Sequence, residues 1–433
     1  MGERGPQKQG REMGCMGDEG LSATRNQSSR VPPLLLGLGL AVLLAFLAAA
    51  VAVIIYQHNS GWMYDAKVYR TGGTAALHGQ DLYRKFPPPA FTYTPFAALL
   101  FIPLSYLSTN GLGLLWTTLS ILCLEVSVWL CLGRPWLDHD RPRLALCAAA
   151  CALVIWLDPI SLTLLLGQVN LILMLVVLAD LLSPDTSRWK GLGVGVAAGI
   201  KLLPAFFILY LVLTRRLRAA AVALAGFAAT AAIGVAVLPT DSIRYWGGVV
   251  LDSSRVGDPQ NVRSQSLRSV LVRWAHTTQG IEPWWILLGA AVAVAALLLA
   301  LWAHRRGEEL LAISVCAAAT LLISPITWQH HWVWMVPILL WLAQRAWRAR
   351  SWLIWGVAGV FAIEFLARPY QWGIPVDPVA DLHLNALQLA QSSTYAATAV
   401  LFLALAAPVM SVTSHHTSTS PVLTGGRPNS DVK

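Results

Sequence analysis

Charged side chains are scarce in this chain. Asp, Glu, Lys and Arg make up 12% of its 433 residues, whereas hydrophobic residues make up 56%. A soluble globular chain carries about 25% charged residues, so half of the usual solvating charge is missing. This composition excludes a disordered chain and argues against a water-soluble enzyme of this length. Because the apolar residues come in runs of about twenty, long enough to cross a bilayer, we predict an all-α polytopic membrane protein.

Cysteine is also sparse, and its pattern excludes two common kinds of site. The chain has six cysteines, five of them in or beside apolar runs, and it contains no CxxC pair. We therefore expect neither a disulfide framework nor a zinc site, and we interpret these cysteines as small core residues.

The net charge of +9 would suggest nucleic acid as a partner if the protein were soluble. Here the basic residues form short clusters between apolar runs, which is the pattern that orients membrane proteins. Compact clusters at 214–218, 304–306 and 345–350 indicate the cytoplasmic side. We expect membrane lipids as partners, no nucleic acid, and a multi-pass location in the plasma membrane.

Twelve apolar stretches are candidates for spanning helices. They are 34–56, 91–108, 111–132, 144–157, 160–182, 190–213, 217–238, 284–303, 309–323, 331–344, 351–367 and 393–411. We expect residues 31–411 to form a single transmembrane domain between two disordered cytoplasmic tails, 1–30 and 412–433.

This topology collects the long polar segments on the outer face. They are 57–90, 239–283 and 368–392, with the short turn 324–330 beside them. Loops on one face of a rigid scaffold usually carry function, so we expect the active site there.

Asp65 heads a short amphipathic helix in the first outer segment, with Gly79 as the predicted stop. One interpretation is a helix N-cap, for which Asp is preferred. The other is a carboxylate at the membrane surface that accepts a proton from a substrate hydroxyl. Both can hold, since a capping residue is rigidly placed.

Three polar residues lie inside apolar segments and need partners there. Gln168 and Asn170 must either bond to a neighbouring helix or face a wet cavity. Lys201 stands ten residues into a predicted span, with Pro204 breaking the backbone ladder after it. We interpret Lys201 as a contact for a phosphate at the membrane boundary. Glu125, Asp158 and Glu364 have no equally specific surroundings and are interpreted as structural.

Two outer segments contain further candidates. The stretch from Asn261 to Arg268, flanked by Arg255 and Arg273, is either a solvated basic loop or a guanidinium clamp for phosphate. The segment from Ser324 to Pro337 holds Trp328 and the adjacent pair His330 and His331. Such a pair is suited to proton transfer or to a phosphate contact. The tryptophan is suited to stacking on a sugar, although aromatic residues also gather at membrane interfaces.

Five stretches, taken in order, resemble glycosyltransferase family 87, the polyprenol-phosphate-mannose-dependent mannosyltransferases of the GT-C superfamily. They are Asp65-x-x-x-Tyr69 with His78-Gly79 and Leu82-Tyr83, Gly167-Gln168-x-Asn170, Lys201-x-x-Pro204, Gln265-Ser-Leu-Arg268, and Ser324-Pro-x-x-Trp328-x-His330-His331. The resemblance spans about residues 60 to 340. Ser264 and Ser269 depart from it, since Asn and Gly are expected around the Gln265 stretch.

The resemblance implies a GT-C fold of about twelve transmembrane helices with catalytic loops on the outer face. It implies inverting transfer of mannose from polyprenyl-phosphate-mannose to a phosphatidylinositol mannoside, with an α-1,2 linkage and with no metal or cofactor. Asp65 is the expected base, with His330 and His331 as its rivals. The expected donor-phosphate and substrate contacts are Lys201, Arg268, Gln265, Gln168, Asn170, Tyr69 and Trp328.

Three alternatives remain open at this stage. The acceptor could be lipomannan or lipoarabinomannan, because acceptor choice lies in loop shape. A transporter of lipid-linked sugars would also use broken helices, although the chain has no two matching halves. The third is a scaffold without activity, in which the aspartate and the histidine pair are coincidental.

Overall fold

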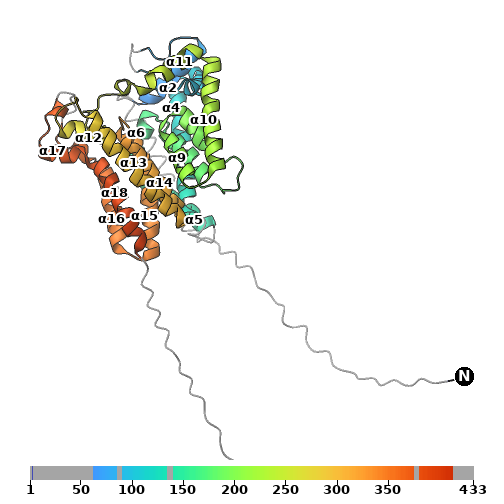
Figure 1. The fold of residues 1–433 in the computed structure, drawn as a ribbon, viewed down its shortest axis with the longest axis vertical. Helices are drawn as coiled ribbons and strands as arrows, with labels where there is room; N and C mark the ends of the chain where they lie inside the picture. Colours follow the sequence, from blue (N-terminus) through green and yellow to red (C-terminus); the bar gives the residue numbers. More distant parts are fainter. Residues whose placement is uncertain (1, 3–61, 85–89, 134–139, 375–379, 413–433) are drawn as a thin grey trace, which may run out of the picture.

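The computed structural model describes Gly2 and residues 62–84, 90–133, 140–374 and 380–412. Within these ranges every regular element is a helix, and the only pairing of extended backbone is an isolated bridge between Ser264 and Trp328. The all-α prediction is therefore confirmed for the part of the chain described (Figure 1). The expected first span, 34–56, and the two tails lie outside the described residues.

The elements follow the chain in this order. The first half contains α2 (Tyr64–Leu77), α3 (Pro95–Phe101), η1 (Ile102–Tyr106), α4 (Thr109–Leu132), α5 (Asp140–Val154), α6 (Asp158–Leu166), α7 (Asn170–Leu181), α8 (Leu192–Ile200), η3 (Leu203–Ala205), α9 (Phe206–Leu213) and α10 (Leu217–Val237). The second half contains α11 (Pro239–Gly247), η4 (Val249–Leu251), η5 (Ser253–Arg255), α12 (Leu267–Trp274), α13 (Glu282–Arg305), α14 (Glu309–Ile323), η6 (Gln329–Trp334), α15 (Met335–Ala349), α16 (Trp352–Ala367), η7 (Pro369–Gln371), η8 (Ala380–Leu382), α17 (Ala386–Ser392) and α18 (Thr394–Ser411).

Fewer helices are long enough to cross a membrane than the apolar pattern predicts. Five described helices qualify, namely α4, α10, α13, α16 with η7, and α18, and a sixth span results if α5 and α6 are counted as one helix bent by 81°. The remaining apolar segments form shorter helices of 10–17 residues, among them α7 and α14. The described residues therefore give a polytopic helical protein with five or six spans.

Two expected spans are interrupted where polar residues occur. We expected 160–182 to be one helix, but α6 ends at Leu166 because Gly167 adopts a left-handed backbone with φ of 68°. In 190–213 the interruption lies where Pro204 was expected to break the backbone ladder. Helix α8 ends at Ile200, Lys201 is extended, and a 3₁₀ turn containing Pro204 precedes α9. Backbone freed in this way is tolerated at membrane depth only where protein or a cavity surrounds it.

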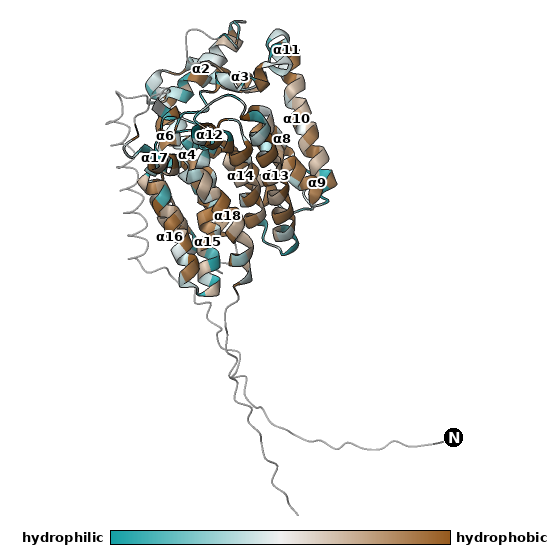
Figure 2. Ribbon diagram, turned by 60° about the vertical axis from the view of Figure 1, so that its left-hand side comes forward, coloured by the Kyte–Doolittle hydropathy of each residue, from teal (hydrophilic) through white to brown (hydrophobic). Residues whose placement is uncertain are grey.

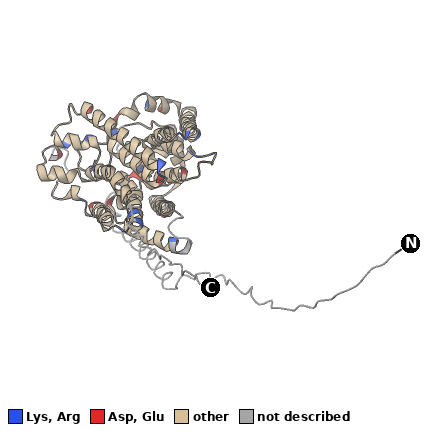
Figure 3. Cartoon of the chain, turned by 60° about the horizontal axis from the view of Figure 1, so that its bottom comes forward, with Lys and Arg blue, Asp and Glu red and all other residues tan. Residues whose placement is uncertain are grey.

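The hydropathy of the helices fits a lipid environment. Figure 2 shows strongly apolar ribbons along α13, α14, α16 and α18, while more hydrophilic segments gather at the ends of the bundle. Figure 3 shows basic and acidic residues as scattered marks on a largely uncharged ribbon. The long helices thus present apolar side chains both to one another and outward.

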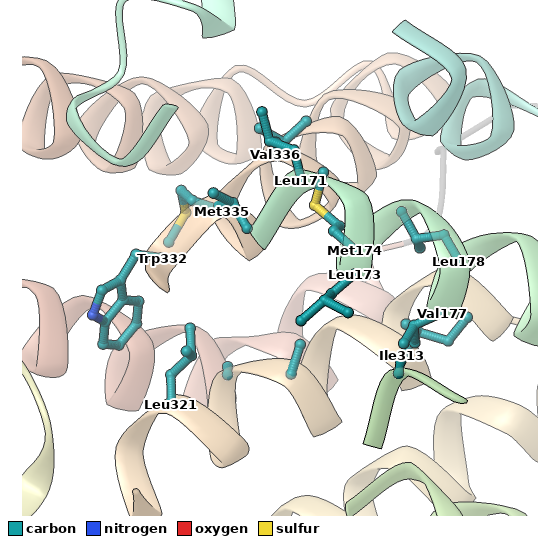
Figure 4. Close-up of a cluster of buried hydrophobic side chains, with 14 of the residues drawn as sticks. Leu171, Leu173, Met174, Val177, Leu178, Ile313, Leu321, Trp332, Met335 and Val336 are labelled. Carbon is teal, nitrogen blue, oxygen red and sulfur yellow. The ribbon is translucent and has the colours of Figure 1, made fainter. Parts of the chain in front are cut away.

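Part of the core lies where α7 meets α14, η6 and α15, which follow one another much later in the chain. Figure 4 shows apolar side chains of α7 and α14 facing those of η6 and the start of α15. The labelled members are Leu171, Leu173, Met174, Val177, Leu178, Ile313, Leu321, Trp332, Met335 and Val336, all of them buried. In lipid such contacts stabilise through close fit rather than through water exclusion. This packing holds the break before α7 against η6, which carries the histidine pair.

Helices α2 and α11 lie at the same end of the molecule in Figures 1 and 2, and contacts between their segments hold this end together. Asp81, just after α2, forms an ion pair with Arg244 of α11 at 2.6 Å. The amide of Leu82 donates to the carboxylate of Asp241 at 3.2 Å. These contacts fix α2, and with it Asp65, relative to the helices that follow.

Candidate active site

Asp65 lies in the first turn of α2, beside the break that ends α6. The preceding Met63 has a left-handed backbone, and its amide donates to the carbonyl of Leu165 at 2.9 Å. A Cβ on Gly167 would lie 2.7 Å from the Sδ of Met63, so any side chain there would push the two segments apart. The close approach brings Asp65 next to Gln168, the residue that follows the glycine.

The structure corrects the N-cap interpretation of Asp65. Met63 occupies the N-cap position of α2, and no side chain caps this helix end. The predicted helix itself is present, and Gly79 follows its end with φ of 64°, as expected for a stop. The carboxylate of Asp65 is therefore not engaged in capping and faces a cavity.

Two tyrosine hydroxyls fix the side-chain amide of Gln168. Its Oε1 accepts hydrogen bonds from Tyr69 at 2.9 Å and from Tyr93 at 3.3 Å, and the two hydroxyls lie 3.0 Å apart. All three side chains are buried. Because the carbonyl oxygen of the amide is occupied, its NH₂ group is the one left to donate to Asp65.

Burial raises the pKa of Asp65 to about 6, while the hydrogen bond from Gln168 and the charge of Lys201 oppose the increase. An aspartate in water has a pKa of about 3.9. A carboxylate with a pKa nearer to neutrality is still ionised at pH 7, but it accepts a proton more readily than an ordinary aspartate does. Asp65 thus has the properties of a general base.

The break between α8 and α9 carries Lys201 into the same cavity. Its Nζ lies 3.2 Å from the Oδ1 of Asn170 and 3.2 Å from the Nε2 of His331. The Nδ2 of Asn170 donates in turn to the carbonyl of His330 at 2.8 Å. In the part of the chain that the structure describes, no carboxylate forms an ion pair with Lys201. A cation held by neutral groups beside a cavity is suited to binding an anion.

The two histidine rings lie 4.7 Å apart and are almost perpendicular. Both side chains are buried, yet neither ring nitrogen of His330 nor the Nδ1 of His331 has a hydrogen-bond partner among the described residues. Buried polar atoms without partners are rare in native proteins. Both histidines belong to the lining of the cavity.

The cavity has a volume of about 1050 Å³ and two chemically different sides. Six of the residues expected from the sequence line its polar side, namely Asp65, Gln168, Lys201, Trp328, His330 and His331. Leu202, Leu203, Phe206, Leu209 and Ile323 line its apolar side. Leu202 is 42% exposed and Leu209 is 53% exposed, so the apolar side continues to the outside of the bundle. The cavity can hold a polar head with an apolar chain leaving toward lipid.

Two outer segments pair to form one wall of the cavity. The bridge joins Ser264 to Trp328, and the amide of Gln329 donates to the carbonyl of Arg263 at 3.0 Å. This pairing holds Trp328 in place next to the histidines. Its indole ring lines the cavity, where it can stack on a sugar face.

Two predicted site residues stand behind the cavity rather than on its wall. Tyr69 bonds to Gln168, and Asn170 bonds to Lys201. Neither of them is part of the lining of the large cavity. Their contacts orient the groups that do line it.

Two further predicted residues lie away from the cavity. The Nε2 of Gln265 donates to the carbonyls of Val262 and Ser392 at 2.7 and 2.8 Å. Arg268 forms an ion pair with Glu282 at 3.0 Å. Neither side chain is part of the cavity lining, so the structure separates both from the other candidates.

Two arginines that line the cavity, Arg255 and Arg263, belong to the predicted guanidinium clamp but were not singled out as donor-phosphate contacts. Both stand in or beside the basic stretch from which we chose Arg268. The third neighbour, Arg273, is fully buried and donates to backbone carbonyls, including that of Ser264 at 2.9 Å. An irregular loop has no periodicity, so the spacing of its arginines does not indicate which of them faces inward.

The site combines a carboxylate with a raised pKa, a lysine with neutral partners and two buried histidines, at the end of an apolar passage. Among the described residues, no group of three His, Cys, Asp or Glu side chains is arranged to hold a metal ion. One base and several donors for an anion suit the transfer of a group from a phosphate leaving group to a hydroxyl. The fold and the site together define a membrane-embedded transferase.

Comparison with known proteins identifies the family. The model of "Glycosyltransferase family 87" matches residues 91–325, more than half of the chain. A Mycobacterium tuberculosis protein named "Polyprenol-phosphate-mannose-dependent alpha-(1-2)-phosphatidylinositol pentamannoside mannosyltransferase" is 34% identical over 359 residues, which cover 77% of this chain and 81% of that protein. A Mycolicibacterium smegmatis protein of the same name is 35% identical over 73% of this chain and 80% of its own length.

A second Mycobacterium tuberculosis protein, "Polyprenol-phosphate-mannose-dependent alpha-(1-2)-phosphatidylinositol mannoside mannosyltransferase", is 33% identical over 70% of this chain and 74% of its own length. No solved structure gives a significant match. The chain belongs to glycosyltransferase family 87, and it is a glycosyltransferase.

Proposed function

We propose that this enzyme moves mannose from polyprenyl-phosphate-mannose to a phosphatidylinositol mannoside and forms an α-1,2 linkage with inversion. The observation that carries the proposal is that Asp65, Lys201 and the histidine pair line one cavity together with apolar residues, of which Leu202 and Leu209 are also exposed on the outside of the bundle. The printed names of the relatives supply the donor and the acceptor class.

In the proposed reaction, the acceptor hydroxyl attacks the anomeric carbon of mannose while the bond from that carbon to the phosphate oxygen breaks. Asp65 takes the proton of the hydroxyl, and the polyprenyl phosphate departs with the bonding electron pair. Attack opposite the leaving group converts a β-phosphate into an α-glycoside. No acid is required, because the phosphate leaves as an anion.

Lys201 and His331 are the proposed partners of the leaving phosphate. The ammonium group of Lys201 can only donate, so the Nε2 of His331 accepts from it and the ring proton lies on Nδ1. That Nδ1 is buried without a partner among the described residues, and its N–H can donate to a phosphate oxygen. Charge-assisted donors of this kind stabilise the negative charge that develops as the bond breaks.

The apolar side of the cavity is the proposed place of the polyprenyl chain. Leu202, Phe206 and Leu209 lead from Lys201 to the lipid-facing surface of the bundle. A donor could then enter from the membrane with its phosphate first reaching Lys201. Trp328, on the polar side, is the proposed platform for a mannose ring.

The wider architecture is part of the same proposal. We infer a GT-C fold with about twelve spans, in which residues 31–411 form one catalytic domain between cytoplasmic tails 1–30 and 412–433. The enzyme would lie in the plasma membrane with its active site on the outer face. The basic clusters at 214–218, 304–306 and 345–350 support this orientation.

Purified protein incubated with radiolabelled polyprenyl-phosphate-mannose tests the proposal. With phosphatidylinositol mannosides as acceptors, we expect a labelled product one mannose larger that an α-1,2-specific mannosidase converts back. If mannose is transferred to lipomannan but not to phosphatidylinositol mannosides, the proposed acceptor is wrong and lipomannan is the acceptor. Movement of intact donor across a vesicle membrane without transfer would indicate a transporter instead.

A further inference from the structure

Arg255 belongs to two hollows of the molecule at once. It lines the large cavity that contains Asp65, and it also lines a shallower hollow of about 510 Å³ on the outer end of the bundle. Ile243, Arg244, Gly248 and Asp252 are other members of the lining of this outer hollow. Arg255 therefore stands between the reacting groups and a second opening formed by α11 and the turns after it.

The guanidinium of Arg255 is held in position by Tyr83. Its Nη2 donates to the carbonyl of Tyr83 at 3.0 Å, and its Cζ lies 6.0 Å from the centre of the tyrosine ring. The Nε is buried and has no hydrogen-bond partner among the described residues. The nearby Asp81 is already engaged by Arg244, whose Nη1 contacts its two oxygens at 2.7 and 2.6 Å. The Nε of Arg255 is thus left to donate to an anion.

The edge of the outer hollow is apolar and exposed. Ile243 is 71% exposed on α11, and Leu251 in the following turn is 85% exposed. Large apolar side chains exposed beside arginines are typical of a surface that meets the headgroup level of a membrane. A lipid resting there would bring its phosphate to the arginines while its acyl chains contact Ile243 and Leu251.

We propose that Arg255 binds the phosphodiester of the acceptor glycolipid, so that the mannose head extends through the hollow into the cavity of Asp65. The inference rests on the proposed function and names the acceptor subsite. It assigns two anions to two places, with the donor phosphate at Lys201 and the acceptor phosphodiester at Arg255. A guanidinium is suited to this role because its paired donors match two phosphate oxygens.

Steady-state kinetics of Arg255→Gln with two acceptors tests the proposal. One acceptor is a phosphatidylinositol mannoside, and the other is a neutral alkyl mannoside that ends in the same mannose. In the variant, we expect the KM of the anionic acceptor to rise about ten- to hundred-fold, because a charge-assisted hydrogen bond is lost. The KM of the neutral acceptor and that of the donor should stay at their wild-type values. Arg255→Lys should recover part of the preference for the anionic acceptor.

Arg218→Gln is the matched control, since this exposed arginine donates to backbone carbonyls at the opposite end of α10. If only the KM of the donor rises, Arg255 binds the donor phosphate and the proposal is overturned. Equal loss of activity with both acceptors, or no change with either, would overturn it as well.

Direct binding separates this inference from the proposed reaction. Without donor, Arg218→Gln should bind the phosphatidylinositol mannoside in nanodiscs as tightly as wild type, whereas Arg255→Gln should bind it more weakly. If no mannose transfer is found but this binding difference persists, the reaction fails and the subsite stands. If transfer is found and both variants bind equally, the subsite fails alone.

Discussion

The Nζ of Lys201 lies 3.2 Å from the Nε2 of His331, and these two residues are 130 positions apart in the chain. An ammonium group has no acceptor site, so the contact fixes His331 as the neutral tautomer with its proton on Nδ1. A histidine in this state is unsuited to accept a proton at Nε2, and its Nδ1, which is buried without a partner among the described residues, is left to donate. The pair is thus better suited to hold an anion than to act as a base.

Neutralising Lys201 should weaken the use of the donor. In Lys201→Met we expect the rate to fall about ten- to hundred-fold, the effect of losing one charge-assisted hydrogen bond to the leaving group. Lys201→Arg keeps the charge and should retain more activity. The measurement is mannose transfer at saturating acceptor, with correct membrane insertion checked in parallel. Full activity in Lys201→Met would reject the contact.

Removing the charge of Asp65 should abolish transfer without unfolding the protein. Asp65→Asn keeps the shape of the side chain, and loss of a general base lowers rates by about 10²–10⁴-fold. Asp258→Asn, an exposed aspartate of the outer loop, is the matched control and should behave as wild type. If Asp65→Asn stays active while His330→Ala or His331→Ala is inactive, a histidine is the base.

The pH profile should report the raised pKa of Asp65. The base must be ionised, so kcat/KM should be flat near neutral pH and fall tenfold per pH unit below about 6. The positive charge of Lys201 lowers this pKa, so Lys201→Met should move the acid limb to higher pH. If the acid limb of the kcat/KM profile stays at the same pH in Lys201→Met, a group other than Asp65 controls this limb.

Arg263 and Arg268 offer a paired test of which arginine meets the donor. Arg263 lines the cavity, whereas Arg268 is paired with Glu282 outside it. We expect Arg263→Gln to raise the KM of the donor about tenfold, with little change in Arg268→Gln. The reverse result would restore the assignment to Arg268 that the sequence motif suggests.

Gly167 should be intolerant of any side chain. Alanine there must adopt a left-handed backbone and would place its Cβ 2.7 Å from the Sδ of Met63. We expect Gly167→Ala to destabilise the protein by about 1–3 kcal/mol, seen as a lower unfolding midpoint in detergent, and to reduce activity by displacing Gln168. Gly356→Ala in α16, where a Cβ meets no atom within 4 Å, is the control and should not lower the midpoint.

The sequence predicted the helical class, the short helix of Asp65 and the interruption near Lys201 because each has a local cause. The composition predicts the helical class. An amphipathic pattern that ends at Gly79 predicts the short helix of Asp65, and Pro204 predicts the interruption near Lys201. The break at Gly167 was not predicted, since a glycine inside an apolar run is compatible with a continuous helix. Only its packing against Met63 selects the left-handed conformation.

The candidate site shows the same difference between features with a local cause and features that depend on distant contacts. Residues attached to helix ends, such as Asp65, Lys201 and His331, do lie around one cavity. Their roles stay predictions. Arg268 and Gln265 were chosen from a loop whose side-chain directions depend on distant partners, here Glu282 and Ser392. Contacts of this kind cannot be predicted from the local sequence. Which of Arg263 and Arg268 lines the cavity therefore depends on the folded structure.

The bridge between Ser264 and Trp328 has a mechanical consequence. It joins the loop before α12 to the turn before η6, so these two segments cannot separate without breaking backbone hydrogen bonds. Arg273 adds a buried anchor from α12 to the same loop. A displacement that widens the cavity on this side must therefore carry Trp328, Arg263 and α12 together. Product would therefore leave past one wall that moves as a unit and not past loops that move independently.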